Sequence, residues 1–186
     1  MFGFGKKNAK IQSERLLEKK IDCFVSIGFA ASTNKKIKTG DICIPKNIIC
    51  SNGKKKKTSN KIRLLLKKKL NTKSFDEDLF CSEKIIYQKY EKQILYEKFQ
   101  AGLIDMESEG VQLTADKHDI PFVAIKVILD NSETSIPKEL VNLYINEKKN
   151  LDWIKIPIFF PMILKLGIDY FKAKKNLSKV CNSLFK

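Results

Sequence analysis

The sequence predicts an α/β fold in a single domain that spans residues 1–186. Two contrasting patterns lead to this prediction. Residues 121–129 (PFVAIKVIL) are almost continuously apolar, which is typical of a strand covered on both faces, as in a parallel sheet. Residues 83–99 instead repeat apolar side chains about every 3.6 positions, the period of an amphipathic helix. Since segments of these two kinds alternate along the chain, we expect strands joined by right-handed helical crossovers.

The first half of the chain follows this alternation. In the first segment, Ile11 and the pair Leu16–Leu17 are spaced to face one side of a helix. Pro45 places its strand at a sheet edge or a bulge, because proline cannot donate a ladder hydrogen bond. Four consecutive lysines repel one another and indicate a solvated loop. We expect a helix at 8–19, a strand at 22–28, a strand at 41–50, a loop at 53–60 and a helix at 61–70.

The second half contains the clearest elements. Ile86, Tyr90 and Ile94 recur on one face of a helix, and a polar stretch follows the long apolar strand. We expect a strand at 77–81, helices at 83–99 and 106–118, strands at 101–105 and 121–129, and final helices at 137–147 and 161–178.

The net charge is +15, from 36 basic and 21 acidic residues. Such a surplus attracts nucleic acid or anionic lipid. All the basic residues except Arg15 and Arg63 are lysine, however, whereas nucleic-acid readers use arginine for bidentate contacts to guanine and phosphate. The lysine run also has no interleaved aromatic residue. We therefore attribute the surplus to compositional drift and expect no specific nucleic-acid partner; a basic nucleic-acid-binding module is kept as an alternative.

The cysteines and the single histidine indicate neither a metal site nor a thiol catalyst. There are five cysteines, an odd number, and none forms a C-x-x-C pair. His118 precedes a proline-led strand with no ligand partner near it in sequence. The N-terminus lacks the apolar core of a signal peptide, and no apolar stretch reaches the roughly 18 residues of a membrane-spanning helix. We expect reduced thiols and a cytoplasmic location.

Candidate chemistry lies where strands end, because open parallel sheets bind ligands beyond the carboxyl ends of their strands. Three segments qualify, at 28–32, 105–109 and 130–131. Gly28 lets a ligand approach the backbone, and the amides that follow it can bind an anion or a carbonyl.

The other two strand ends carry carboxylates. Glu107 suits a ribose diol, since a carboxylate accepts two hydroxyl hydrogen bonds, and Met106 can lie under a sugar face. Asp130 can act as a general acid if burial raises its pKa. Structural roles compete with these. Asp105 or Glu109 can be a favourable charge at a helix N-terminus, Met106 can belong to the core, and Asp130 can cap a turn.

Residues 101–131 (AGLIDMESEGVQLTADKHDIPFVAIKVILDN) resemble the nucleoside phosphorylase/nucleosidase family, which includes purine nucleoside phosphorylases and methylthioadenosine/S-adenosylhomocysteine nucleosidases. The shared signature is a strand ending in an Asp- or Glu-Met-Glu turn, then a helix, then a strand ending in aspartate. Residues 24–44 (FVSIGFAASTNKKIKTGDICI) are similar to an upstream family segment, and residues 82–108 fit the approach to the signature. The tail from residue 151 resembles the end of the phosphorylases associated with hopanoid lipid synthesis.

This resemblance implies a three-layer α/β/α domain with a central mixed sheet, acting on N-glycosidic bonds of purine nucleosides. Glu107 matches the residue that holds the ribose hydroxyls, and Met106 matches the methionine packed on the ribose. Asp130 matches the acid that protonates the purine ring as the base leaves. The backbone around Phe29 and Ala30 matches the loop lining base and sugar. The substrate-binding candidates are thus Glu107, Met106, Asp105, Gly28, Phe29 and Ala30, with Asp130 as the catalytic residue.

The sequence also departs from the family pattern. Ala31-Ser32 replace a glycine pair, and Leu129 replaces the serine that usually precedes the catalytic aspartate. The chain begins near the family's third strand, so we expect an N-terminally truncated domain without a phosphate-binding glycine loop or an N-terminal catalytic acid. Two hypotheses stand: an enzyme, or an inactive nucleoside-binding relative or fragment. Hydrolysis and phosphorolysis both stay open. We expect no cofactor, phosphate only as a co-substrate, and a homo-oligomer.

The tail at 153–186 is dense in apolar residues and then rich in lysine. Pro157 and Pro161 interrupt its first part, so we expect the regular helix to begin near Pro161. One hypothesis is that this helix packs on the sheet. The other is that its apolar face and lysines make peripheral contact with an anionic membrane that presents a lipid-linked nucleoside.

Overall fold

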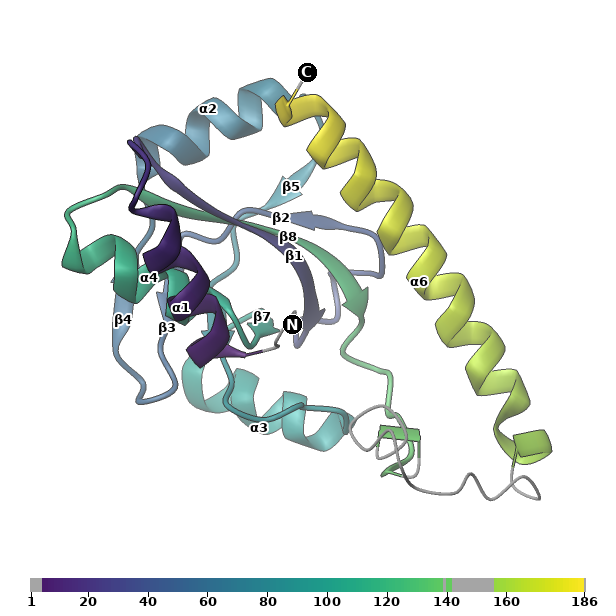
Figure 1. The fold of residues 1–186 in the computed structure, drawn as a ribbon. Helices are drawn as coiled ribbons and strands as arrows, with labels where there is room; N and C mark the ends of the chain where they lie inside the picture. The colour runs from purple at the N-terminus through teal and green to yellow at the C-terminus, as the bar shows by residue number, and fades with distance from the viewer. Residues whose placement is uncertain (1–4, 139, 142–155, 186) are drawn as a thin grey trace.

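The computed structural model describes residues 5–138, 140, 141 and 156–185, which form an eight-stranded sheet between helices (Figure 1). In chain order the elements are α1 (Lys6–Leu16), β1 (Phe24–Ser32), β2 (Ile42–Cys43), β3 (Asn47–Ile49), β4 (Lys55–Lys57), α2 (Asn60–Leu70), β5 (Ser74–Phe75), β6 (Leu79–Cys81), α3 (Lys89–Phe99), β7 (Leu103–Asp105), α4 (Ser108–Lys117), β8 (Phe122–Asp130) and α6 (Ile156–Phe185). The strands lie in the order β4-β3-β6-β7-β1-β8-β2-β5.

The centre of the sheet is the parallel pair β1 and β8, which run side by side along their whole length. Alternate side chains of β8 enter two different cores. Ala124 and Ile128 pack beneath α1 and α4, whereas Ile125 and Val127 pack beneath α2 and α6. The prediction of a strand buried on both faces is confirmed, and with it the three-layer α/β/α architecture.

The sheet is mixed, as the family resemblance implied. β7 runs antiparallel to β1, β2 antiparallel to β8, and β4 antiparallel to β3, while the other pairings are parallel. Because β1 and β8 point the same way, their carboxyl ends meet at one edge of the sheet. The antiparallel register places Ile104 of β7 opposite Ala31, so the end of β7 turns toward the same place. The functional site is built there.

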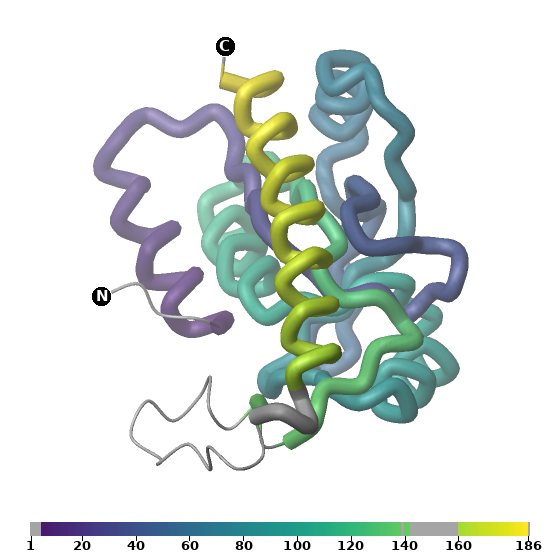
Figure 2. Tube along the Cα trace, turned by 90° about the vertical axis from the view of Figure 1, so that its right-hand side faces the viewer, coloured from purple at the N-terminus to yellow at the C-terminus, as the bar shows by residue number. Residues whose placement is uncertain are grey.

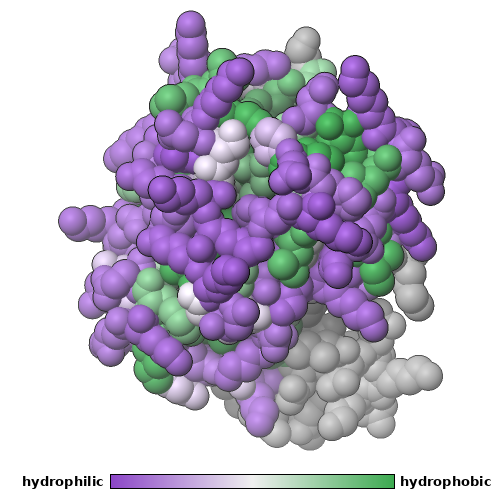
Figure 3. Space-filling view, turned by 90° about the vertical axis from the view of Figure 1, so that its left-hand side faces the viewer, coloured by the Kyte–Doolittle hydropathy of each residue, from purple (hydrophilic) through white to green (hydrophobic). Residues whose placement is uncertain are grey.

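Helices α1 and α4 pack against each other on one face of the sheet. Their contact is so close that a Cβ atom on Gly110 would lie 2.9 Å from the backbone nitrogen of Lys10 and nearer still to the carbonyl oxygen of Lys6. Ser13 Oγ donates a hydrogen bond of 2.7 Å to Thr114 Oγ1 across the interface. The face of the molecule seen in Figure 3 is mostly hydrophilic, with small separate apolar patches.

Helix α6 runs across the opposite face (Figures 1 and 2). Ala173 and Val180 are buried against the β8 side chains, so the hypothesis that the tail packs on the sheet holds for the described part of the helix. The helix begins at Ile156 rather than near Pro161, and it continues through Pro161 although that residue cannot donate a helical hydrogen bond. No helix among the described residues combines the length and apolarity required to cross a membrane.

Several predicted boundaries are wrong for local reasons. β1 does not stop at Gly28 but continues to Ser32, with a register shift between Ala30 and Ala31. The expected strand at 41–50 is two short strands with different partners, β2 on β8 and β3 on β6, separated at Pro45. The turn at Gly53, which has a φ of 83°, leads into β4, so the lysine segment is an edge strand and not a loop.

Two predicted helices also differ from the structure. The helix at 83–99 begins only at Lys89, because Gln88 forms a capping box in which its backbone nitrogen donates to Glu91 Oε2 at 3.3 Å. The helix at 106–118 begins at Ser108. The expected helix at 137–147 falls largely outside the described residues.

Candidate active site

A cavity of about 450 Å³ opens where β1, β7 and β8 end. It brings together most of the residues that the sequence singled out, although they are up to about a hundred positions apart in the chain. The predicted site residues that line it are Phe29, Ala30, Asp105, Met106, Glu107 and Asp130. Gly28 does not line this cavity. It lies within β1 opposite Lys126, so its proposed part in substrate binding stays a prediction.

Glu107 stands at the N-cap of α4 with its carboxylate held by backbone amides. Gly5 N donates to Oε1 at 3.0 Å, and Met106 N donates to Oε2 at 3.3 Å. Each oxygen keeps a second lone pair, because a carboxylate accepts about four hydrogen bonds. The arrangement therefore fixes the carboxylate while leaving capacity for two hydroxyl donors.

Asp105 is bound by groups of the protein itself. Its Oδ2 accepts from Ser108 N at 3.1 Å and from Ser108 Oγ at 2.5 Å, and it forms an ion pair of 2.8 Å with Lys126 Nζ. Both charged side chains are almost fully buried, so the attraction between them offsets the cost of removing each charge from water. Asp105 thus orients the start of α4, which is the structural role that the sequence left open, and a direct substrate contact stays a prediction.

Glu109 has a structural environment of a similar kind. Its carboxylate accepts from the backbone nitrogen of Ser51 at 2.9 Å and pairs with Lys6 Nζ at 3.4 Å. These contacts tie α4 to α1 and to the loop after β3. Glu109 does not line the cavity.

Asp130 is the most unusual carboxyl group of the site. Its Oδ2 lies 2.6 Å from Lys92 Nζ, whereas its buried Oδ1 has no hydrogen-bond partner among the described residues. Burial raises the pKa of Asp130, against the opposing effect of Lys92. Burial likewise lowers the pKa of Lys92, which Asp130 opposes. A raised pKa and an uncommitted oxygen are the properties a general acid needs.

The comparisons with known proteins decide the family, although no family model matches the chain. The chain is 30% identical to the 5′-methylthioadenosine/S-adenosylhomocysteine nucleosidase of Buchnera aphidicola subsp. Baizongia pistaciae, over 94% of this chain and 75% of that protein. The chain belongs to this nucleosidase family. It is also 26% identical to the nucleosidase of Buchnera aphidicola subsp. Acyrthosiphon pisum, over 90% of this chain and 79% of that protein.

Solved structures of the nucleosidase superfamily share its fold. Futalosine hydrolase of Helicobacter pylori matches with a TM-score of 0.69 at 16% identity, over 96% of this chain and 76% of that chain. The methylthioadenosine/S-adenosylhomocysteine nucleosidase of Campylobacter jejuni matches with a TM-score of 0.68 at 18% identity, over 97% and 77%. The nucleoside phosphorylase/nucleosidase resemblance is confirmed, and it makes the protein an enzyme of glycosyl-bond cleavage. The hopanoid branch stays a prediction.

The remaining walls of the cavity are mostly apolar. They come from the segment before α3, from the strand ends and from the region after β8, including one residue of α6. These residues are Ile85, Ile86, Tyr87, Ile104, Leu129, Ile136, Leu140, Val141 and Leu166. Sequence reasoning missed most of them, because residues 85–87 were assigned to a helix and Leu166 lies far along the chain. Among the described residues, no cluster of histidine, cysteine or carboxylate side chains is arranged to hold a metal ion.

Proposed function

We propose that the protein hydrolyses the N-glycosidic bond of an adenine nucleoside whose 5′ position carries an apolar thioether. Glu107 and Asp130 line one cavity, and this observation carries the proposal. The first carboxylate binds the sugar, and the second protonates the base. The named relatives are nucleosidases, which supports water as the attacking group over phosphate.

The proposed chemistry begins at the base. Asp130 donates its proton to N7 of the purine, so that adenine departs as a neutral group and the ribose gains oxocarbenium character. Oδ1 is the oxygen placed to make this transfer, because Oδ2 is bound by Lys92. The electron pair of the glycosidic bond moves to the base, and water adds to C1′ and releases a proton to solvent. Asp130 then takes up a proton from solvent, which restores the acid for the next turnover.

The sugar is held by Glu107 through its two hydroxyl groups, with Met106 against the ribose. The negative charge of Glu107 lies on the side of the cavity where positive charge develops in the transition state, which is electrostatic stabilisation. The apolar wall that includes Ile136 and Leu140 suits a 5′ thioether better than a free hydroxyl or a phosphate, because a polar group there would lose its water without gaining a partner.

The proposal is tested by incubating the protein with methylthioadenosine, S-adenosylhomocysteine and adenosine, and measuring free adenine with and without phosphate. We expect adenine release that does not depend on phosphate and is fastest with methylthioadenosine. Release only in the presence of phosphate would replace hydrolysis by phosphorolysis. Calorimetric binding of methylthioadenosine without any adenine release would instead identify an inactive nucleoside-binding relative.

A further inference from the structure

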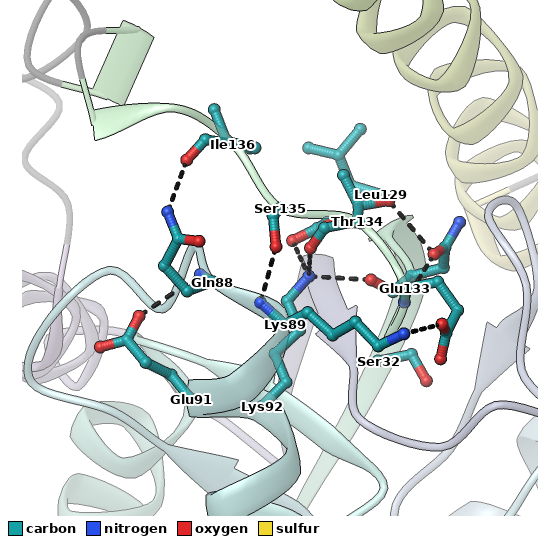
Figure 4. Close-up of polar contacts among 12 residues, drawn as sticks. Ser32, Gln88, Lys89, Glu91, Lys92, Leu129, Glu133, Thr134, Ser135 and Ile136 are labelled. Atoms are coloured by element: carbon teal, nitrogen blue, oxygen red, sulfur yellow. Dashed lines mark hydrogen bonds and ion pairs between the residues drawn. The ribbon is translucent and has the colours of Figure 1, made fainter.

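Lys92 is a buried cation to which the sequence analysis assigned no role, although it lies in the 82–108 segment that fits the family's approach to the signature. It belongs to α3, and its side chain is only 1% exposed. Its ammonium group has three acceptors: Asp130 Oδ2 at 2.6 Å, the carbonyl oxygen of Asn131 at 2.8 Å and that of Thr134 at 3.0 Å. All three N–H bonds of the ammonium are therefore used on the last residue of β8 and on the segment that follows it (Figure 4).

The neighbours of Lys92 hold the same segment without touching Asp130. Gln88 Nε2 donates to the carbonyl oxygen of Ile136 at 3.0 Å, and the backbone nitrogen of Lys89 donates to Ser135 Oγ at 3.0 Å (Figure 4). Lys89 Nζ forms an exposed ion pair with Glu133. The start of α3 thus fixes the path of residues 131–136, and Lys92 adds a direct contact to the carboxyl group.

This contact makes the two oxygens of Asp130 unequal. Oδ2 is fixed by Lys92, while Oδ1 is buried without a partner at the cavity. A carboxyl group without the lysine would be free to rotate about its terminal torsion, which has broad minima. With the lysine in place, one oxygen is anchored and the other keeps a single position at the cavity wall.

We propose that Lys92 is a positioning residue for the catalytic acid, fixing Asp130 through Oδ2 so that Oδ1 meets the purine base. The inference rests on the proposed function of Asp130. It assigns to Lys92 a part in the chemical step, beyond the structural part that any buried ion pair has. A proton transfer that depends on orientation loses about 100-fold in rate when the groups are misplaced by an ångström.

The pH dependence of the enzymatic activity provides a second test of the positioning role of Lys92. The charged groups near the pair are Lys92 from α3, Asp169 from α6, which raises the pKa of Asp130, and Glu133, which acts on Lys92. A general acid must be protonated, so activity falls as pH rises through the pKa of Asp130. Without Lys92, burial and Asp169 are opposed by the Thr134 side chain alone, and the pKa of Asp130 rises. The alkaline fall in activity then moves to higher pH.

The test compares Lys92→Met with Lys89→Met, a change on the same helix at an exposed lysine that does not touch Asp130. We expect Lys92→Met to lower kcat about 100-fold with little change in KM, and to shift the alkaline limb upward. Lys89→Met should leave both unchanged. A Lys92→Met enzyme with wild-type kcat, or with an unshifted pH profile, would overturn the proposal.

The contact between Lys92 and Asp130 can also be measured in the protein without substrate. This measurement separates the inference about Lys92 from the proposed function. In the wild-type protein, ¹³C NMR of the Asp130 carboxyl and ¹⁵N NMR of Lys92 Nζ should titrate together, with the carboxyl signal assigned by its loss in Asp130→Asn. Independent titration of the two groups would refute the positioning role even if no variant at Lys92 folds. Joint titration in a protein that releases no adenine would refute the proposed function alone.

Discussion

Asp130 combines burial, a single lysine partner and a free oxygen, and its substitution is the most direct test of the chemistry. We predict that Asp130→Asn lowers adenine release at least about 100-fold, because asparagine keeps the shape but has no acidic proton to transfer to the base. Binding of methylthioadenosine should persist within a few-fold. Stopped-flow or chromatographic assay of adenine gives the rate, and calorimetry gives the affinity; comparable turnover in the two proteins would remove Asp130 from the mechanism.

Glu107 should discriminate sugar from base. We predict that Glu107→Gln weakens binding of ribosides by roughly 1.5–3 kcal/mol for each hydrogen bond lost to the charged group, and leaves the affinity for free adenine nearly unchanged. Calorimetric titration with methylthioadenosine and with adenine measures both. Because Glu107 also accepts from Gly5 and Met106, thermal unfolding of the variant serves as the control for folding. Equal losses for both ligands would reject the ribose role.

The sequence identified Glu107 and Asp130 because each follows a recognisable apolar strand. It assigned no role to Lys92, although this residue lies in the 82–108 segment that fits the family pattern. Burial of a cation depends on which acceptors the fold brings to it. Here those acceptors lie at residues 130–134, and only tertiary structure places them against α3. A similar limit applies to Asp105, whose partner Lys126 is on another strand.

At the scale of elements, the contact between α1 and α4 depends on Gly110. We predict that Gly110→Ala destabilises the protein by about 1–3 kcal/mol, because the new methyl group would overlap the backbone of Lys6 and Lys10. Gly167→Ala is the matched control: it lies within α6, nothing lies within 4 Å of its Cβ position, and alanine is favoured there by about 1 kcal/mol. Urea unfolding compares the two; equal effects would contradict the close packing.

The sequence predicted well those elements whose residues follow one unambiguous hydrophobic pattern. β8 is apolar except for Lys126 and its final residue Asp130, and it is found within a residue of its expected bounds. The errors occur where a local signal competed with tertiary context. Apolar spacing extended the helix at 83–99 too far, although Tyr90 and Ile94 are exposed and the capping box at Gln88 sets the true start. The lysine run was predicted to be a solvated loop. Its side chains are largely exposed, but the segment forms the edge strand β4, where charged side chains are tolerated.

At the scale of the whole molecule, α6 leaves an apolar stripe uncovered in the described structure. Phe160, Leu164, Ile168 and Phe171 are all more than half exposed. Lysines such as Lys165, Lys172 and Lys175 follow along the same helix. Peripheral contact with a membrane and association with a second copy therefore both stay predictions, and one measurement separates them.

We predict binding to vesicles of anionic lipid but not to neutral vesicles, with loss of binding at high salt. Deleting the tail would remove Ala173 and Val180 from the core, so the variant Phe171→Ser is the better probe. It should weaken co-sedimentation with anionic vesicles while leaving the unfolding transition in place. Absence of co-sedimentation at low salt, together with a dimer in size-exclusion chromatography, would assign the stripe to a second copy.

The hydrogen bond from the backbone amide of Gly5 to Glu107 links the first turn of α1 to the carboxylate proposed to hold the ribose. Any ligand that locks Glu107 in place must, by thermodynamic reciprocity, also favour the arrangement in which this hydrogen bond is made. Deuterium uptake at the Gly5 amide would then slow on adding methylthioadenosine, and would slow less with adenine alone. An amide at the start of the helix thus becomes a reporter of sugar occupancy, readable in a protein that has not turned over a single substrate molecule.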